Sequence, residues 1–151
     1  MNRSKSIGTA AETAVVNHCK ASGFPGARRI ALAGALDRGD VQLTDHVILE
    51  VKAGAQAHQP TPLVIERWMA ETEAERINAS ASHAFLVTKS KGHGVANVDK
   101  WHVYVTVSAL DRIAVGRSSS WWGVSNVVVR LSFGALLQIM LDSGLGGDSN
   151  K

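Results

Sequence analysis

Two short segments of alternating apolar and polar residues, 39–43 and 47–52, constrain the fold of this chain more than any other feature. Alternation with a period of two is typical of β-strands. The segment 44–46 between them is turn-like and short enough for a hairpin connection. The sequence therefore predicts an antiparallel hairpin, and with it a β-sheet, in the first third of the chain.

The register of this hairpin follows from its loop. A three-residue loop pairs Leu43 with Val47 and places Asp40 opposite Glu50. One face of the hairpin then carries an apolar set suited to a core: Val41, Leu43, Val47, Leu49 and Val51. The other face carries Asp40, Gln42, Ile48, Glu50 and Lys52. Because a slip of one residue would exchange the two faces, the pattern itself favours this register.

The second face brings two carboxylates and an amine together. In close approach, Asp40 and Glu50 would repel each other and raise one pKa unless a cation lay between them. Hard oxygen ligands with open positions suit Mg²⁺ or Mn²⁺. Lys52 on the same face would hold or polarise an attacking water whose pKa the metal lowers, which is the chemistry of phosphodiester hydrolysis. The alternative is a solvated charge pair between Glu50 and Lys52 on an ordinary strand.

Residues 8–20 are expected to form a helix whose apolar stripe consists of Ala11, Ala14, Val15 and Cys19. Glu12 lies at the border of this stripe. A carboxylate directed toward the sheet needs a partner, which a metal site or a basic group would supply. The alternative is a first-turn glutamate stabilised by the helix dipole.

The order of Glu12, then Gly39-Asp40, then Glu50-Val51-Lys52, then a further helix resembles the PD-(D/E)XK nuclease superfamily. Gly39 stands where that pattern often has proline. The resemblance implies an α/β protein of restriction-endonuclease-like fold, a mixed central sheet flanked by helices. It also implies Mg²⁺ or Mn²⁺ bound by Asp40, Glu50 and the Val51 carbonyl, with Lys52 orienting the water and Glu12 supporting the metal or the water. The expected catalytic set is Glu12, Asp40, Glu50 and Lys52.

The resemblance extends to Holliday-junction-resolvase-like nucleases of actinobacterial phages and their hosts. It is carried by Trp68 with Glu71 and by the segments 85–92, 101–105 and 130–146, and it covers roughly residues 5–146. It implies a homodimeric, metal-dependent endonuclease that resolves branched DNA in the cytoplasm of a bacterium or of a phage-infected host. Two alternatives remain: a nuclease of this fold acting on flapped, single-stranded or linear DNA, and a non-catalytic DNA-binding protein of this fold.

Composition agrees with one compact domain. At 151 residues with 45% hydrophobic content, the chain has room for one core. We expect a single nuclease domain over 1–145 and a flexible tail over 146–151. The formal net charge of +3 fits a polyanionic partner without requiring one. The predicted nucleic-acid contacts are Arg28, Arg29, Lys89 and Lys91, for which the alternative is solvated loops.

Several features argue against a disulfide-bonded, a membrane-spanning or a zinc-binding protein. A single cysteine, Cys19, excludes an internal disulfide and indicates a reducing cytoplasm, and no apolar run approaches the length of a membrane span. The six histidines lack metal-ligand spacing, which argues against a zinc site. Trp121 and Trp122 are expected to stack on unpaired bases or to form a subunit contact.

The remaining elements follow from periodicity and capping. We expect a helix from Pro62 to about Ala79 capped by Thr61, strands at about 84–89, 101–107 and 126–131, a short helix near 108–113 and a last helix capped by Ser132. The helix 62–79 carries four glutamates, which are mostly interpreted as a solvated face: Glu66, Glu71, Glu73 and Glu75. Glu71 is considered for the site but left outside the predicted set.

Overall fold

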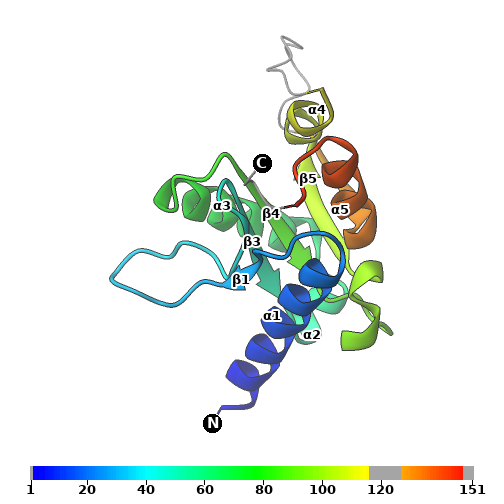
Figure 1. Cartoon of the computed structure of the whole chain (residues 1–151). Coiled ribbons are helices and arrows are strands. Elements are labelled where there is room, and N and C mark those ends of the chain that lie inside the picture. Colours follow the sequence, from blue (N-terminus) through cyan, green and yellow to red (C-terminus); the bar gives the residue numbers. More distant parts are fainter. Residues whose placement is uncertain (1, 116–126, 148–151) are drawn as a thin grey trace.

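The computed structural model describes residues 2–115 and 127–147 (Figure 1). In this part of the chain, six strands form one sheet: β1 (Arg28–Arg29), β2 (Val41–Thr44), β3 (Val47–Lys52), β4 (His83–Thr88), β5 (His102–Thr106) and β6 (Val128–Ser132). The helices are α1 (Arg3–Ala21), α2 (Ala55–His58), α3 (Pro62–Asn78), α4 (Val107–Val115) and α5 (Phe133–Asp142), with a 3₁₀ segment η1 (Val95–Lys100). Trp121 and Trp122 lie outside the described residues.

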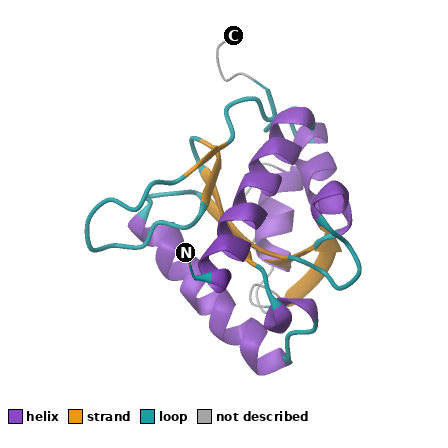
Figure 2. Ribbon diagram, turned by 90° about the horizontal axis from the view of Figure 1, so that it is seen from below, coloured by secondary structure: helices purple, strands orange, loops and turns teal. Residues whose placement is uncertain are grey.

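The strands lie in the sheet in the order in which they occur along the chain. Only β3 and β4 are parallel among the pairs of this sheet, and the other described pairs are antiparallel. Parallel neighbours need a crossover connection, which α3 provides. The protein is therefore a mixed α/β protein, with helices on both faces of a mixed sheet (Figure 2).

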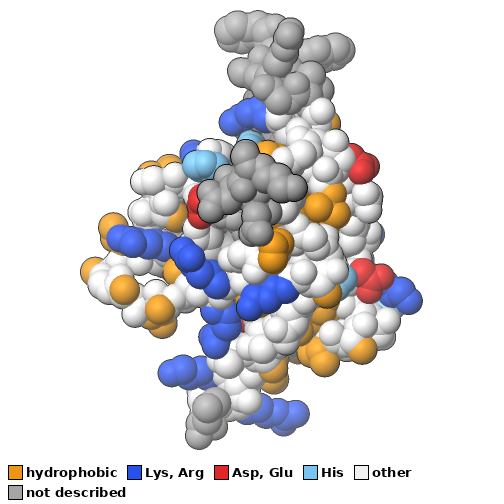
Figure 3. All heavy atoms as spheres, in the orientation of Figure 1, with side chains coloured by type: hydrophobic (Ala, Val, Ile, Leu, Met, Phe, Trp, Pro, Cys, Tyr) orange, Lys and Arg blue, Asp and Glu red, His pale blue; other side chains and the backbone are white. Residues whose placement is uncertain are grey.

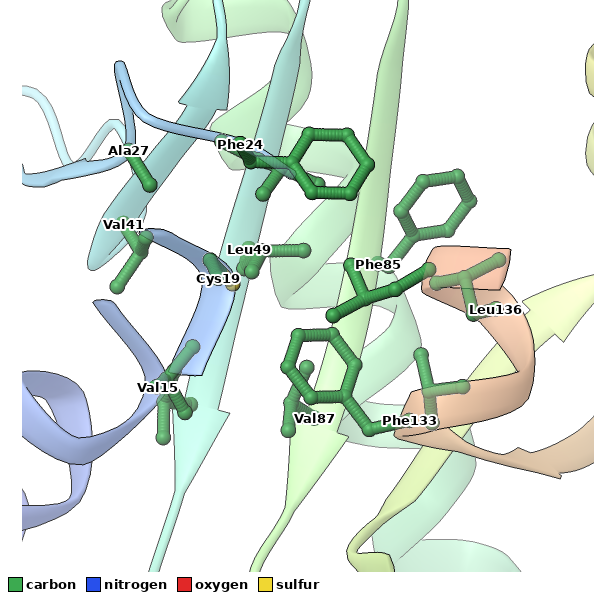
Figure 4. Close-up of a cluster of buried hydrophobic side chains, with 14 of the residues drawn as sticks. Val15, Cys19, Phe24, Ala27, Val41, Leu49, Phe85, Val87, Phe133 and Leu136 are labelled. Atoms are coloured by element: carbon green, nitrogen blue, oxygen red, sulfur yellow. The ribbon is translucent and has the colours of Figure 1, made fainter. Parts of the chain in front are cut away.

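One face of the sheet packs against α1 and α5 (Figure 4). Val15 and Cys19 of α1 and Phe133 of α5 meet the strand side chains of Leu49 and Phe85, and all five are essentially inaccessible to solvent. Burial raises the pKa of the Cys19 thiol to about 12, so this cysteine behaves as a small apolar side chain.

The opposite face packs against α3. Trp68 of α3 forms a second apolar cluster with Leu86 of β4, Tyr104 of β5 and Ala57 of α2. Because β3 is covered on both faces, its alternation in sequence does not become an alternation in exposure, and Glu50 is buried together with the other residues from Val47 to Val51.

The β2–β3 hairpin differs from the prediction at its turn. The structure pairs Val41 with Leu49, which agrees with the predicted register, but it pairs Thr44 with Val47, so the predicted pairing of Leu43 with Val47 is wrong. The register shifts between Gln42 and Thr44. A bulge there absorbs one extra residue and allows a two-residue turn, while Leu43 stays buried. The register at the Asp40 end is unaffected.

The caps confirm two predicted helix starts. Thr61 Oγ1 accepts a hydrogen bond from the Val64 N–H at 3.3 Å, and Ser132 Oγ accepts one from the Ala135 N–H at 3.2 Å. The first helix begins earlier than expected, after Asn2. The short elements β1, α2 and η1 were not predicted, because two to six residues are too few to show a periodic pattern.

The end of the described chain lies against the first loop. The Gly147 N–H donates a hydrogen bond of 2.9 Å to the Gly23 carbonyl, and residues 148–151 of the predicted tail lie outside the description. None of the helices in residues 2–115 and 127–147 combines the length and the apolar character needed to cross a bilayer.

Candidate active site

Asp40 lies just before β2 and is fixed to β3 by the backbone. Its N–H donates to the Leu49 carbonyl at 3.0 Å, and its Oδ2 accepts a hydrogen bond of 2.8 Å from the Val51 N–H. The preceding residue, Gly39, has a φ of 87°, and a Cβ there would lie 3.1 Å from Ile48 Cδ1. Proline is locked near a φ of about −65° and could not adopt this conformation. Glycine at this position is thus a requirement of the local backbone.

Glu50 lies beside Asp40 in the middle of the sheet. Its side chain is 8% exposed, and its Oε1 lies 2.8 Å from Lys52 Nζ. Its Oε2 is buried and receives no hydrogen bond from a donor among the described residues, and the Glu50 carboxyl lies within hydrogen-bond reach of the Asp40 and Glu75 carboxyls, with which it can share a proton. A buried carboxylate oxygen without a donor is costly, so this atom marks a position where a cation or a proton is favourable.

Lys52 is held on three sides. Its Nζ contacts Glu50, lies 3.3 Å from Glu71 Oε2 and lies 5.8 Å from the centre of the Trp68 ring. Burial alone would lower the pKa of Lys52, but the hydrogen bonds and charges of the two glutamates outweigh it and raise that pKa. The amine is therefore an ammonium at neutral pH, a donor of hydrogen bonds and not a base.

Helix α3 supplies two carboxylates in register with β3. As a crossover between parallel strands, α3 runs antiparallel to β3. Four residues of a helix rise about 6 Å, which nearly equals the rise of about 6.6 Å over two residues of a strand. Side chains four positions apart in α3 can therefore face side chains two positions apart in β3. Glu71 therefore lies opposite Lys52, and one turn further along Glu75 lies opposite Glu50.

The prediction that most of these glutamates form a solvated face is confirmed for Glu66, Glu71 and Glu73, which are exposed, and the exception is Glu75, which is buried. Its Oε2 also lacks a hydrogen-bond partner within the described residues. The signal was available in the sequence, since Trp68, Thr72 and Glu75 follow the spacing of a buried helical stripe. A glutamate on that stripe indicates a polar site under the helix.

The three carboxyl groups all have raised pKa values. Burial, followed by the charge of Glu50, raises the pKa of Asp40 to about 8. Burial raises the pKa of Glu50 to about 7 against the opposing effect of Lys52, and burial raises that of Glu75 to about 7 as well. The raised pKa values show that negative charge on these oxygens is unfavourable, so either protonation or a bound cation would stabilise them.

Glu12 lies near this group but is bound elsewhere. Its Oε2 accepts hydrogen bonds from Arg29 Nη2 at 2.6 Å and from Arg29 Nε at 2.9 Å. The sequence allowed either a metal site or a basic group as the partner of Glu12, and the structure shows the basic group, Arg29. Its charge still contributes to raising the pKa of Asp40, so Glu12 belongs to the surroundings of the site.

The oxygen atoms of this site can be compared with the needs of a divalent cation. Within residues 2–115 and 127–147, no three or more His, Cys, Asp or Glu side chains are arranged to hold a metal ion together. The predicted set needs only two carboxylates, Asp40 and Glu50, with the Val51 carbonyl. Mg²⁺ is commonly held by one or two carboxylates and keeps several waters, so these residues fit it. The unpartnered Oε2 of Glu50 is the observation that supports the fit.

The predicted nucleic-acid contacts flank the carboxylates on two sides. Arg28 and Arg29 form β1, where Arg28 donates to Gln42 at 2.8 Å. Lys89 and Lys91 follow β4, and the Lys89 N–H donates to the Lys52 carbonyl at 2.9 Å, which places this segment at the same end of the sheet as the site. The Lys89 ammonium lies 5.9 Å from the centre of the Trp101 ring.

Lys91 also lines a basic cleft that sequence reasoning missed. The cleft lies between the start of α3 and the strands β5 and β6, with His58, His102 and Arg130 among its walls. Burial and the nearby positive charges of Arg130 and His93 lower the pKa of His102. The cleft could not be predicted from the sequence, because Lys91 and Arg130 are 39 positions apart and come together only in the fold.

Comparisons with protein-family models, with curated proteins and with solved structures found no match to this chain. The interpretation of the site therefore depends on its own geometry and on the resemblance of its motifs.

Proposed function

We propose that this protein is a metal-dependent DNA endonuclease of the PD-(D/E)XK type, in which Asp40, Glu50 and the Val51 carbonyl hold Mg²⁺ or Mn²⁺. The observation that carries the proposal is the pair of the half-buried Asp40 and the buried Glu50, with the unpartnered Glu50 Oε2 and the ammonium of Lys52 on the same strand as Glu50. Burial of carboxyl groups without full hydrogen bonding lowers the stability of a fold, and ionisable groups with pKa values shifted in this way cluster at functional sites.

The residues divide the chemistry among them. When bound, the metal would lower the pKa of a water and neutralise charge on a phosphate. The Lys52 ammonium donates a hydrogen bond to that water or to a phosphate oxygen, and Glu71 fixes its position. The Val51 N–H orients the Asp40 carboxylate. Glu75 adds negative charge behind Glu50 and strengthens the preference of the site for a cation.

The topology supports a restriction-endonuclease-like fold. The two site strands are a hairpin, β2 and β3, and a helix then leads from the lysine strand to a parallel neighbour. The order helix, hairpin with Asp40 and Glu50, crossover helix is the one that the motif resemblance implies. We propose this fold assignment together with the activity.

The proposed substrate is branched DNA, and the proposed assembly is a homodimer in the cytoplasm of a bacterium or of a phage-infected host. Basic side chains on both sides of the carboxylates, Arg28, Arg29, Lys89 and Lys91, support a polyanionic substrate. Symmetric cuts on two strands of a four-way junction require two sites, which a dimer of this chain would supply.

The second candidate is a non-catalytic DNA-binding protein with this architecture. The observation that favours it is the short contact between Lys52 and Glu50, which neutralises one carboxylate without any cation. The two candidates differ in whether the site binds a divalent ion.

The test is cleavage of synthetic substrates. A four-way junction, a flapped duplex, a single strand and a linear duplex of matched sequence are incubated with the protein and Mg²⁺, or with a chelator. Resolution of the junction with Mg²⁺ alone supports the full proposal, and cleavage of another substrate supports a same-fold nuclease with that target. Binding of DNA without cleavage of any substrate would favour the non-catalytic candidate.

A further inference from the structure

The loop between β1 and β2 exposes an apolar surface that nothing in the described fold covers. Residues 31–38 are all exposed, and Leu32 and Leu36 have 94% and 59% of their surface accessible. The stretch from Ile30 to Leu36 contains only isoleucine, leucine, alanine and glycine. A run of consecutive exposed apolar residues is unfavourable in water unless it has a function.

The loop stands away from the body of the molecule but has a fixed base. Figure 1 shows it as a long extension beside the sheet. At the base, the Ile30 N–H donates to the Asp40 carbonyl at 2.8 Å, and Asn78 Nδ2 of α3 donates to the Asp37 carbonyl at 2.8 Å. The Gly39 N–H donates to Asp37 Oδ1 at 3.0 Å. The apolar tip is thus held in a defined position relative to Asp40.

The reach of the loop matches the scale of a nucleic acid. Four residues out and four back span at most about 13 Å from the base at about 3.3 Å per residue. That distance corresponds to about four base steps of 3.4 Å along a DNA strand. A phosphate at Asp40 and Glu50 would therefore leave the tip within a few nucleotides of the cut.

The positive charges around the loop also indicate a nucleic acid as its partner. Arg28 and Arg29 lie at its start and Arg38 near its end, and all three are exposed. Figure 3 shows blue basic side chains next to the orange apolar ones on this extension. Apolar side chains inserted between bases, with arginines on the adjacent phosphates, are a known way for proteins to bind deformed DNA.

We propose that the loop 31–38 is an apolar wedge: Leu32 and Leu36 contact unstacked bases at a DNA branch point while Arg28, Arg29 and Arg38 contact the flanking phosphates. This inference deepens the proposed function and rests on it, because it assigns the choice of branched over linear DNA to this loop. Bases at a branch are already partly unstacked, so the wedge gains contacts there at little cost.

The test measures binding without cleavage. A four-way junction with 2-aminopurine beside the branch point and a linear duplex with the same base are titrated with the protein in chelator. Stacking quenches this base, so insertion of the wedge raises its fluorescence. The variant Leu32→Ser/Leu36→Ser is compared with Leu63→Ser/Ile77→Ser, whose positions in α3 are 75% and 62% exposed and serve as a matched control.

We expect the native protein and the control to raise the fluorescence of the junction, and the loop variant to lose most of this rise. The loop variant should bind the junction about 10-fold more weakly, as expected for the loss of one base stack, and the duplex within about 2-fold of the native protein. Equal fluorescence and equal selectivity in the loop variant would overturn the wedge alone. Native protein that binds neither DNA would overturn both the wedge and the proposed function.

A second copy of this chain is the other partner that could cover the apolar side chains of this loop. Light scattering of the native protein and of the loop variant decides this point. An unchanged oligomeric state, together with the lost fluorescence, supports the wedge. Conversion of a dimer into a monomer by Leu32→Ser/Leu36→Ser would overturn it and assign the loop to a subunit contact.

Discussion

The Val51 N–H donates a 2.8 Å hydrogen bond to Asp40 Oδ2, which joins the first candidate ligand to the strand that carries the second. Asp40 has no regular ladder partner of its own, since β2 begins at Val41. This bond therefore holds the carboxylate beside Glu50 in the absence of any cation. A site whose ligands are already positioned binds its ion without the cost of ordering them.

The raised pKa values predict a pH dependence of stability for the metal-free protein. A carboxyl group with a higher pKa in the folded state binds protons that the unfolded chain releases, so the free energy of unfolding falls as the pH rises between the two values. For Asp40 that window extends from 3.8 to about 8. We expect the Tm in chelator to fall across this window, and Asp40→Asn to make the decline shallower. A Tm that rises with pH, and rises equally in the variant, would show that the pKa of Asp40 is not raised in the folded protein.

Divalent cations should stabilise the protein. At about 100 times the Kd, a ligand bound only to the folded state adds about 2.7 kcal/mol to the free energy of unfolding, or about 5–10 °C in Tm for a domain of this size. We expect Mg²⁺ or Mn²⁺ to raise the Tm of the native protein and of Glu71→Gln, but not that of Glu50→Gln. Scanning calorimetry with and without the ion checks this. An equal rise in all three proteins would place the ion outside the Asp40 and Glu50 pair.

The hairpin and its acids could be predicted from sequence, because a period of two is a local signal and the sorting of faces fixes the register. The bulge before Thr44 could not, since it depends on how the turn closes. The pairing of Glu12 with Arg29 joins residues 17 positions apart and needs the packing of α1 on β1. The role of Glu75 was hidden by the polar surroundings of its helix, although its place on the Trp68 stripe indicated burial.

The variant Lys52→Ala should distinguish the contribution of Lys52 to folding stability from its contribution to the rate of cleavage. The change leaves Glu50 buried without its 2.8 Å partner, and we expect the free energy of unfolding to fall by about 1–3 kcal/mol near neutral pH. Cleavage should slow by more than the loss of folded protein explains, because the hydrogen-bond donor to the water or phosphate is gone. Denaturant unfolding and single-turnover cleavage are measured on the same preparation. Full cleavage activity in the folded variant would remove Lys52 from the catalytic set.

The basic cleft should contribute to DNA affinity. If Lys91 and Arg130 each neutralise one phosphate, Lys91→Gln and Arg130→Gln should each make the slope of log affinity against log salt shallower by about 0.9. Lys20→Gln, an exposed change at the end of α1 on the other face of the sheet, is the matched control. A slope that changes as much in the control as in the cleft variants would argue against phosphate contacts in the cleft.

The central claim is that Asp40 and Glu50 act in phosphodiester cleavage, and the single-turnover rate of junction cleavage at saturating Mg²⁺ tests it most directly. We predict that Asp40→Asn and Glu50→Gln each reduce the rate by at least about 10²-fold, as expected when charge stabilisation in the transition state is lost, while both variants stay folded and bind the junction as tightly as the native protein or more so. Cleavage at the native rate by either folded variant would contradict the account.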